Sequence, residues 1–131
     1  MKLEIKNIDI ARIVGFLEQT NFKGIASINR SKVTNYLTKQ LQEVIEGEKT
    51  IREDGKNKPE QWLAKELRTY FDETVTVEGA NFLKPLKVIE SKIKELTAED
   101  SDKEFSGDEA YALSVLYEAF ELGGEGDKNS K

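Results

Sequence analysis

The apolar positions of this chain fall into two short runs with strand spacing and several longer runs with helical spacing. Residues 3–6 and 74–78 alternate apolar with polar side chains, which is the period of a half-buried strand. Because these are the only two strand candidates, we expect them to pair as a short antiparallel ribbon. A ribbon of two strands is marginal alone, so it should lie against the helices.

The remaining apolar residues recur three, four and seven positions apart, which predicts about five amphipathic helices. A capping box, Ser106 with Glu109, should open the last of them. In chain order the predicted helices run from Asn7 or Asp9 to Leu17, from about Ser27 to about Asp54, from Pro59 to about Asp72, from just after Pro85 to Leu96, and from Ser106 until Gly123-Gly124 stops the last helix.

The second predicted helix is long for a globular domain, at about 28 residues. We expect it to be a spine for the other helices or one half of a helix pair. Two glycines inside helices need a reason, because glycine costs up to about 1 kcal/mol against alanine there. Gly15 is expected to admit a neighbouring backbone and Gly47 to bend the long helix, whereas Gly24 suits a left-handed turn.

These elements predict a mostly α (α+β) fold with a single globular domain over residues 1–122. The chain has 131 residues and 14.9 kDa, which is one domain's worth of protein. Residues 123–131 are polar and glycine-rich, so they are expected to form a disordered tail.

Composition excludes several classes of chemistry. The chain contains no Cys and no His, which removes disulfides, thiolate catalysis, imidazole catalysis and Cys or His zinc sites. Asp100–Glu104 is acidic, but the calcium-loop pattern counted from Asp100 has Phe105 where glycine is required and Tyr111 where glutamate is required. We therefore expect no enzymatic activity, no metal site and no cofactor.

Charge is unevenly placed along the chain. The net charge is −5 with a pI near 5.0, which excludes a generally basic nucleic-acid binder. Residues 1–40 nevertheless hold seven basic side chains against three acids, and the last third of the chain is acidic. A solvated surface explains this pattern. Alternatively, Arg30 and Lys32 contact an acidic partner or nucleic acid, or the acidic third meets a basic groove on another protein.

Aromatic residues gather on one face of the third predicted helix, where Trp62, Tyr70 and Phe71 fall together. Core packing is one explanation, and an exposed anchor for a protein partner is the other, since Trp and Tyr dominate binding hot spots. Trp62 lies in a first helical turn beside a loop, where complete burial is less expected. Arg30, Lys32, Trp62 and Tyr70 are therefore the candidate partner-binding residues.

The layout also resembles a known family. Its features are the strand leading into Val14-Gly15-Phe16-Leu17, the segment 24–32 that opens a Glu-rich helix, and Ser106–Tyr111 before a Leu/Tyr/Phe helix. It resembles the small proteins of Gram-positive bacteriophages and prophages grouped as domain-of-unknown-function family 1617. The resemblance covers the chain to about Leu122 and implies a phage or prophage product in the bacterial cytoplasm. It implies no activity and no site residue.

The sequence therefore favours a non-enzymatic phage or prophage accessory protein that acts by binding another protein. Virion or tail assembly and inhibition of a host protein both stay open, and self-association is compatible with either. The alternative is a nucleic-acid-binding regulator that uses the basic N-terminal third, in which case Arg12, Lys23, Arg30 and Lys32 should converge on one face. The chain has no run long and apolar enough to predict a membrane span.

Overall fold

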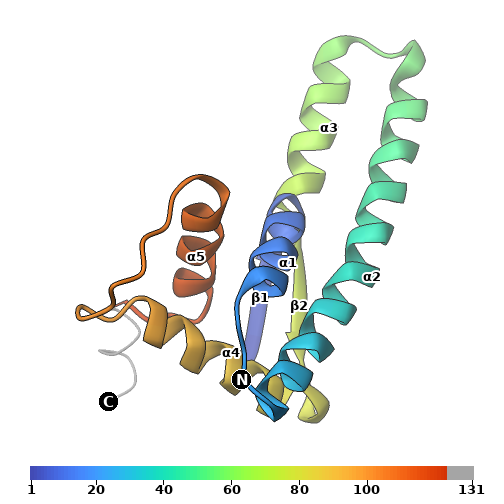
Figure 1. Ribbon diagram of the computed structural model, residues 1–131. Helices are drawn as coiled ribbons and strands as arrows, with labels where there is room; N and C mark the ends of the chain where they lie inside the picture. The colour runs from blue at the N-terminus through green and yellow to red at the C-terminus, as the bar shows by residue number, and fades with distance from the viewer. Residues whose placement is uncertain (124–131) are drawn as a thin grey trace.

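In the computed structural model, which describes residues 1–123, helices surround a small sheet and two of them extend well beyond it (Figure 1). The mostly α fold with a two-stranded ribbon is confirmed. The predicted tail lies outside the described residues, except for Gly123. The elements are β1 (Lys2–Lys6), a 3₁₀ turn (Asn7–Asp9), α1 (Ile10–Gln19), α2 (Ile25–Asp54), a 3₁₀ turn (Gly55–Asn57), α3 (Glu60–Asp72), β2 (Thr74–Glu78), α4 (Ala80–Leu96) and α5 (Gly107–Ala119).

The two strands pair antiparallel, as their alternating patterns predict. Leu3 lies opposite Val77 and Ile5 opposite Val75 in the register. Leu3, Ile5 and Val77 are buried while their polar neighbours are exposed, so one face of the ribbon lies on the helices. The strands are distant in sequence, and their pairing joins the N-terminus to the middle of the chain.

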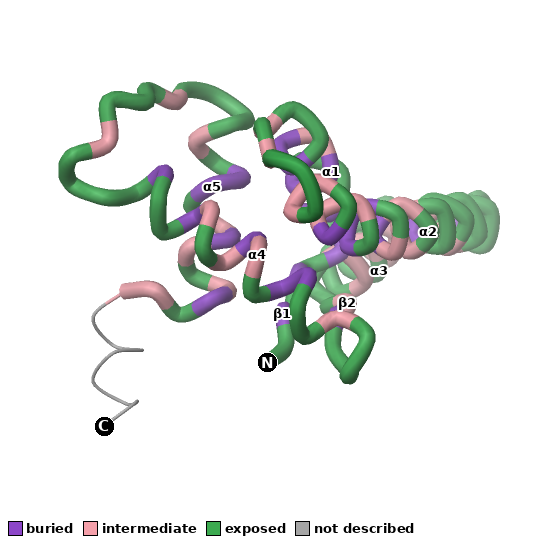
Figure 2. The backbone as a smooth tube through the Cα atoms, turned by 60° about the horizontal axis from the view of Figure 1, so that its bottom comes forward, coloured by how far each residue is buried: buried purple, intermediate pink, exposed green. Residues whose placement is uncertain are grey.

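The core lies between the ribbon, α1, α4, α5 and the first half of α2. Figure 2 shows buried backbone on these elements and mostly exposed backbone at the far end of α2 and α3. The spacing of the apolar residues explains this placement, because each helix presents one apolar stripe inward. Fully buried members include Ile13, Leu17, Leu37, Ile89 and Leu116.

The long helix is both a spine and half of a helix pair. In its first half Val33 and Leu37 are fully buried in the core. Its second half runs alongside α3, and the two helices project together away from the ribbon (Figure 1). From Leu41 to Asp54 the rise of an α-helix gives this second half a length of about 20 Å. We call residues 41–72 the hairpin.

The predicted start of the fourth helix is wrong. The fourth helix begins at Ala80 and contains Pro85, instead of beginning after it. The early start is held by the hydrogen bond from the Phe82 backbone N–H to the Gly79 carbonyl, and by the Phe82 ring, whose centroid is 5.2 Å from that of Tyr36. Pro85 falls early enough in the helix that only one backbone hydrogen bond is lost.

The capping box also does not form. Ser106 is the residue before the fifth helix, as predicted, but its side chain makes no capping hydrogen bond with the described residues. The helix is held differently, by side chains that reach across from the N-terminal part of the chain. The Tyr111 hydroxyl donates a hydrogen bond to the Asp9 carboxylate at 2.6 Å, and Arg12 pairs with Asp108 at 3.2 Å.

The close approach that the sequence predicts at Gly15 occurs at Gly47 instead. A Cβ at Gly15 would meet no described atom within 4 Å outside its own helix, so no close packing requires that glycine. A Cβ at Gly47 would instead overlap the Tyr70 hydroxyl and ring. Gly47 is therefore the position where two helices approach closely. Gly24 has a φ of 51°, which confirms the left-handed turn.

We predict opposite effects of alanine at these two glycines. Gly47→Ala should lower the free energy of unfolding by about 1 to 3 kcal/mol, because the new methyl group forces the Tyr70 ring away. Gly15→Ala should raise it by up to about 1 kcal/mol, because alanine gains helix propensity without a clash. Urea unfolding followed by circular dichroism measures both. Equal effects of the two substitutions would contradict the close approach at Gly47.

Candidate binding surfaces

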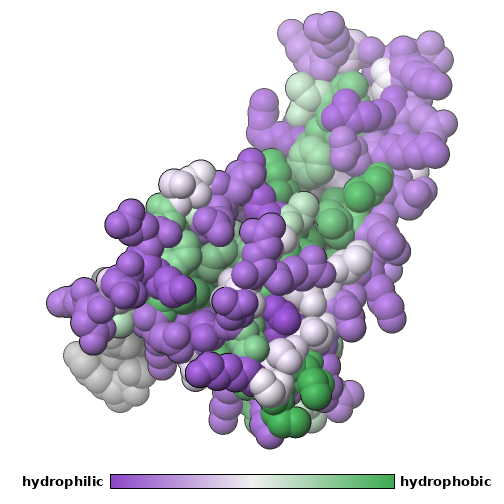
Figure 3. Space-filling view, viewed as in Figure 1, coloured by the Kyte–Doolittle hydropathy of each residue, from purple (hydrophilic) through white to green (hydrophobic). Residues whose placement is uncertain are grey.

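The hairpin is held by a narrow seam of side chains that the protein only partly covers. On α3, within the described part of the chain, no residue is buried. The corresponding half of α2 contributes one buried side chain, Val44. The seam side chains lie half-exposed between the two helices, and Figure 3 shows a hydrophobic strip there with hydrophilic residues on both sides. Its half-buried apolar members are Leu41, Ile51, Trp62, Leu63, Leu67, Tyr70 and Phe71.

Tyr70 fastens the base of the hairpin. Its hydroxyl donates a hydrogen bond to the Val44 carbonyl at 3.1 Å, in the space that Gly47 leaves open. Burial, and then the negative charges of Glu73, Glu48 and Glu43, raise the pKa of the Tyr70 phenol above its ordinary value. The phenol therefore stays neutral and keeps its proton for this bond. The structure gives Tyr70 a structural contact, and a direct contact with a partner stays a prediction.

Trp62 lies at the tip of the hairpin. Its ring packs over Gly55, where a Cβ would be 3.1 Å from the nearest ring atom, and the Lys58 ammonium lies 5.4 Å from the ring centroid. The indole is half-buried, as its place beside a loop predicts. Trp62 therefore closes the tip of the hairpin by packing on Gly55, while part of its indole surface remains exposed.

A shallow groove runs along the outer side of the hairpin and is lined by α2 and the turn that follows it. Ile45 lies at one end of this groove and is 53% exposed. The groove has a volume of about 350 Å³, and Arg52 crosses it to pair with Glu48 at 2.9 Å. Ile45 is the apolar residue of this groove, and the other side chains that line it are charged.

Arg30 is occupied within the protein. One guanidinium nitrogen donates hydrogen bonds to the carbonyls of Leu17 at 2.6 Å and Thr20 at 3.0 Å, at the C-terminal end of α1. A cation there offsets the partial negative charge of unpaired carbonyl groups. The side chain also lies over the Phe22 ring, 5.1 Å from its centroid. Arg30 therefore fixes the connection between α1 and α2, and Lys32 on the same helix is exposed.

The structure does not bring the four candidate residues together. Arg30 and Lys32 lie in the first third of α2, whereas Trp62 packs over Gly55 at its far end. At 1.5 Å per residue, the helix separates Arg30 from Gly55 by about 37 Å. The candidates therefore belong to two separate surfaces.

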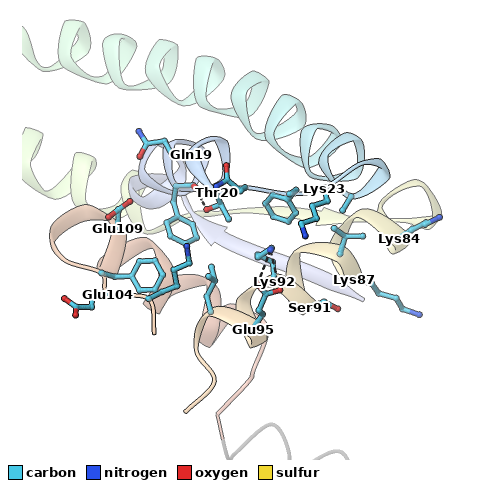
Figure 4. A pocket seen from close by; sticks show the side chains of 18 residues that line it. Gln19, Thr20, Lys23, Lys84, Lys87, Ser91, Lys92, Glu95, Glu104 and Glu109 are labelled. Atoms are coloured by element: carbon cyan, nitrogen blue, oxygen red, sulfur yellow. Dashed lines mark hydrogen bonds and ion pairs between the residues drawn. The ribbon is translucent and has the colours of Figure 1, made fainter. Parts of the chain in front are cut away.

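A second surface lies beside the α1–α2 connection, where the chain forms a cleft of about 850 Å³. We call it the lysine cleft. Its walls are the end of α1, the connection to α2, one face of α4 and the segment before α5 (Figure 4). The charged residues that line it are Lys23, Lys84, Lys87, Lys92, Lys103, Glu95, Glu104 and Glu109.

The floor of the lysine cleft is apolar and aromatic. Phe16 is buried and contacts Phe105, with 6.2 Å between ring centroids. Phe22 lies near two cations, because the Lys92 ammonium is 5.4 Å from its centroid in addition to the Arg30 contact. Lys92 also pairs with Glu95 at 3.3 Å. These contacts hold the floor in place while leaving the rim lysines open.

Sequence reasoning missed Lys84, Lys87 and Lys103 as site residues. Lys84 and Lys87 are three positions apart on one face of α4, a pattern that usually means a solvated face. Only the fold places that face opposite Lys23. The expected convergence of the N-terminal cations is incomplete, since Arg12 pairs with Asp108 and Arg30 binds the end of α1.

The chain was compared with protein-family models, with curated proteins and with solved structures. No protein-family model matches it, and neither the curated proteins nor the solved structures give a match. The resemblance to the phage family stays a prediction. Within residues 1–123, no helix is long and apolar enough to cross a membrane. The same residues contain no group of three or more acids placed to hold a metal ion.

We predict that Arg30 contributes to stability and Lys32 does not. Arg30→Ala should lower the free energy of unfolding by about 2 kcal/mol, because two carbonyls at the end of α1 lose a charged donor. Lys32→Ala, an exposed neighbour on the same helix, should change it by less than about 0.5 kcal/mol. Thermal unfolding at neutral pH compares the two variants. A stability loss shared by both would show that the hydrogen bonds of Arg30 are not its cause.

Proposed function

We propose that this protein is a non-enzymatic binding protein that acts through the hairpin on another protein. The observation that carries the proposal is the uncovered seam. Two helices that pack only on each other cannot enclose their apolar stripes, and here α3 has no buried residue among those described. A third helix or a partner surface would complete the burial, at about 25 cal/mol for each Å² of apolar surface removed from water.

The chemistry of the hairpin supports a protein partner over other ligands. It offers an indole, several aliphatic side chains and a groove beside Ile45, with charged residues around them. Aromatic and aliphatic anchors inside a polar rim are the composition of protein interfaces. The hairpin carries eight acidic and six basic residues, so it offers no excess of cations to a nucleic-acid backbone.

The setting of this function is proposed from the sequence resemblance. A phage or prophage accessory protein would use the hairpin either in virion or tail assembly or to inhibit a host protein. A second copy of the chain is another candidate to cover the seam. A regulator that binds nucleic acid is the alternative. The ion pair of Arg12 with Asp108 and the hydrogen bonds of Arg30 to the end of α1 count against it.

Affinity capture tests the proposed function. The tagged protein is incubated with lysate of phage-infected bacteria, with and without nuclease, and compared with Ile45→Asp and Thr50→Asp variants. Both substitutions place the same new charge at an exposed position of α2, but only Ile45 borders the groove. We expect a partner protein to be recovered in stoichiometric amount with or without nuclease. Its recovery should fall about tenfold with the Ile45→Asp variant and stay unchanged with the Thr50→Asp variant.

Other outcomes would contradict the proposal. Recovery of nucleic acid alone, lost as the salt concentration rises, would favour the regulator. A partner that Ile45→Asp and Thr50→Asp retain equally would show that the groove beside Ile45 is not the contact surface. Light scattering of the purified protein over a range of concentrations separates a second copy from a different partner.

A further inference from the structure

We propose that the lysine cleft is a second binding site and that its ligand is an amphipathic peptide segment of a partner protein, acidic at one end. The inference rests on the proposed function only in taking a protein as the partner. It uses a different surface, because the residues that line the cleft lie outside the hairpin. Its argument depends on three features of the cleft: its open lysines, its apolar floor and the separation of its charges.

One end of the cleft holds cations that lack acidic partners. Lys23, Lys84 and Lys87 form no ion pair with the residues that the structure describes, whereas Lys92 is paired with Glu95. Figure 4 shows Lys23, Lys84 and Lys87 toward the same end of the cleft. Like charges gathered around a concavity repel one another and attract an anion. The end formed by these lysines therefore fits two or more carboxylates.

The floor supplies the apolar part of the recognition. Val88 and Leu96 of α4 join Phe16, Phe22 and Phe105 in lining the cleft. A volume of about 850 Å³ admits several side chains of a ligand. A purely ionic ligand would leave this apolar surface in water, so a ligand with aliphatic or aromatic side chains fits it better.

The opposite end of the cleft is mixed in charge, because Lys103 lies beside Glu104 in the segment before α5. Glu104 and Glu109 lie there, away from Lys84 and Lys87 (Figure 4). A continuous polyanion that filled the cleft would meet these carboxylates, which disfavours nucleic acid. A peptide can change sign along its length and satisfy both ends.

Selection from a random peptide library displayed on yeast tests this inference without assuming the partner. The full-length labelled protein is the bait, and Lys84→Glu combined with Lys87→Glu is compared with Lys39→Glu combined with Lys94→Glu. All four lysines are exposed and both pairs change the net charge equally, but Lys39 and Lys94 do not line the cleft. Lys94 also controls for a new charge on α4.

We expect the selected peptides to combine acidic residues at one end with apolar residues beside them. Their affinity should fall about tenfold or more in the Lys84/Lys87 variant and stay unchanged in the Lys39/Lys94 variant. Reversing the order of a selected peptide, at the same composition and charge, should also weaken binding. A fluorescent oligothymidylate should bind more weakly than the selected peptide.

Three results would overturn the inference: no enrichment of peptides, enriched peptides without acids, or equal binding to both lysine variants. Tighter binding of oligothymidylate than of any peptide would assign the cleft to nucleic acid instead. The Ile45→Asp variant should bind the selected peptides as the unaltered protein does. A loss of lysate capture by the Ile45→Asp variant can therefore be told apart from a loss of peptide binding at the lysine cleft.

Discussion

The continuity of α2 is the constraint on which the rest of the structure depends. Its first half is a wall of the core through Val33 and Leu37, and its second half leaves the core without a break. A helix that continues past the core needs another surface to cover its apolar stripe. The chain returns as α3 and covers that stripe only in part, so the hairpin is a consequence of the length of α2.

The contact between Tyr70 and Gly47 sets where the hairpin closes. The hydroxyl reaches the carbonyl of Val44 because Gly47 has no side chain, so the helices approach closely at this point. Asn7 strengthens the same region by donating a hydrogen bond to the Tyr70 carbonyl at 2.8 Å. Toward the tip, the contacts between the two helices among the described residues are the partly covered seam and the packing of Trp62 and Leu63 against Gly55. The far end of the hairpin therefore depends on few interactions, and it has the most to gain from a partner.

Local sequence patterns predicted the elements well, because they report periodicity. Strand alternation predicted that residues 3–6 and 74–78 pair as an antiparallel ribbon, and the apolar spacing of α2 predicted its length to within two residues. Patterns failed where a distant residue decided the outcome. Tyr36 holds Phe82 and lets α4 begin before Pro85, and Tyr111 reaches Asp9 where a local capping box was expected. The lysine cleft was not predictable for the same reason, since Lys23 and Lys87 meet only through the fold.

The two surfaces differ in the physics of recognition, and this difference gives each a separate signature. The hairpin offers apolar burial, which added salt changes little or strengthens. The lysine cleft relies on partly exposed charges, whose interactions are screened over about 8 Å at physiological ionic strength. Binding at the cleft should therefore weaken as salt rises while binding at the hairpin persists. Ala26, near the start of α2, lines the lysine cleft, and the second half of the same helix carries the hairpin, so the two proposed binding surfaces lie along one continuous helix.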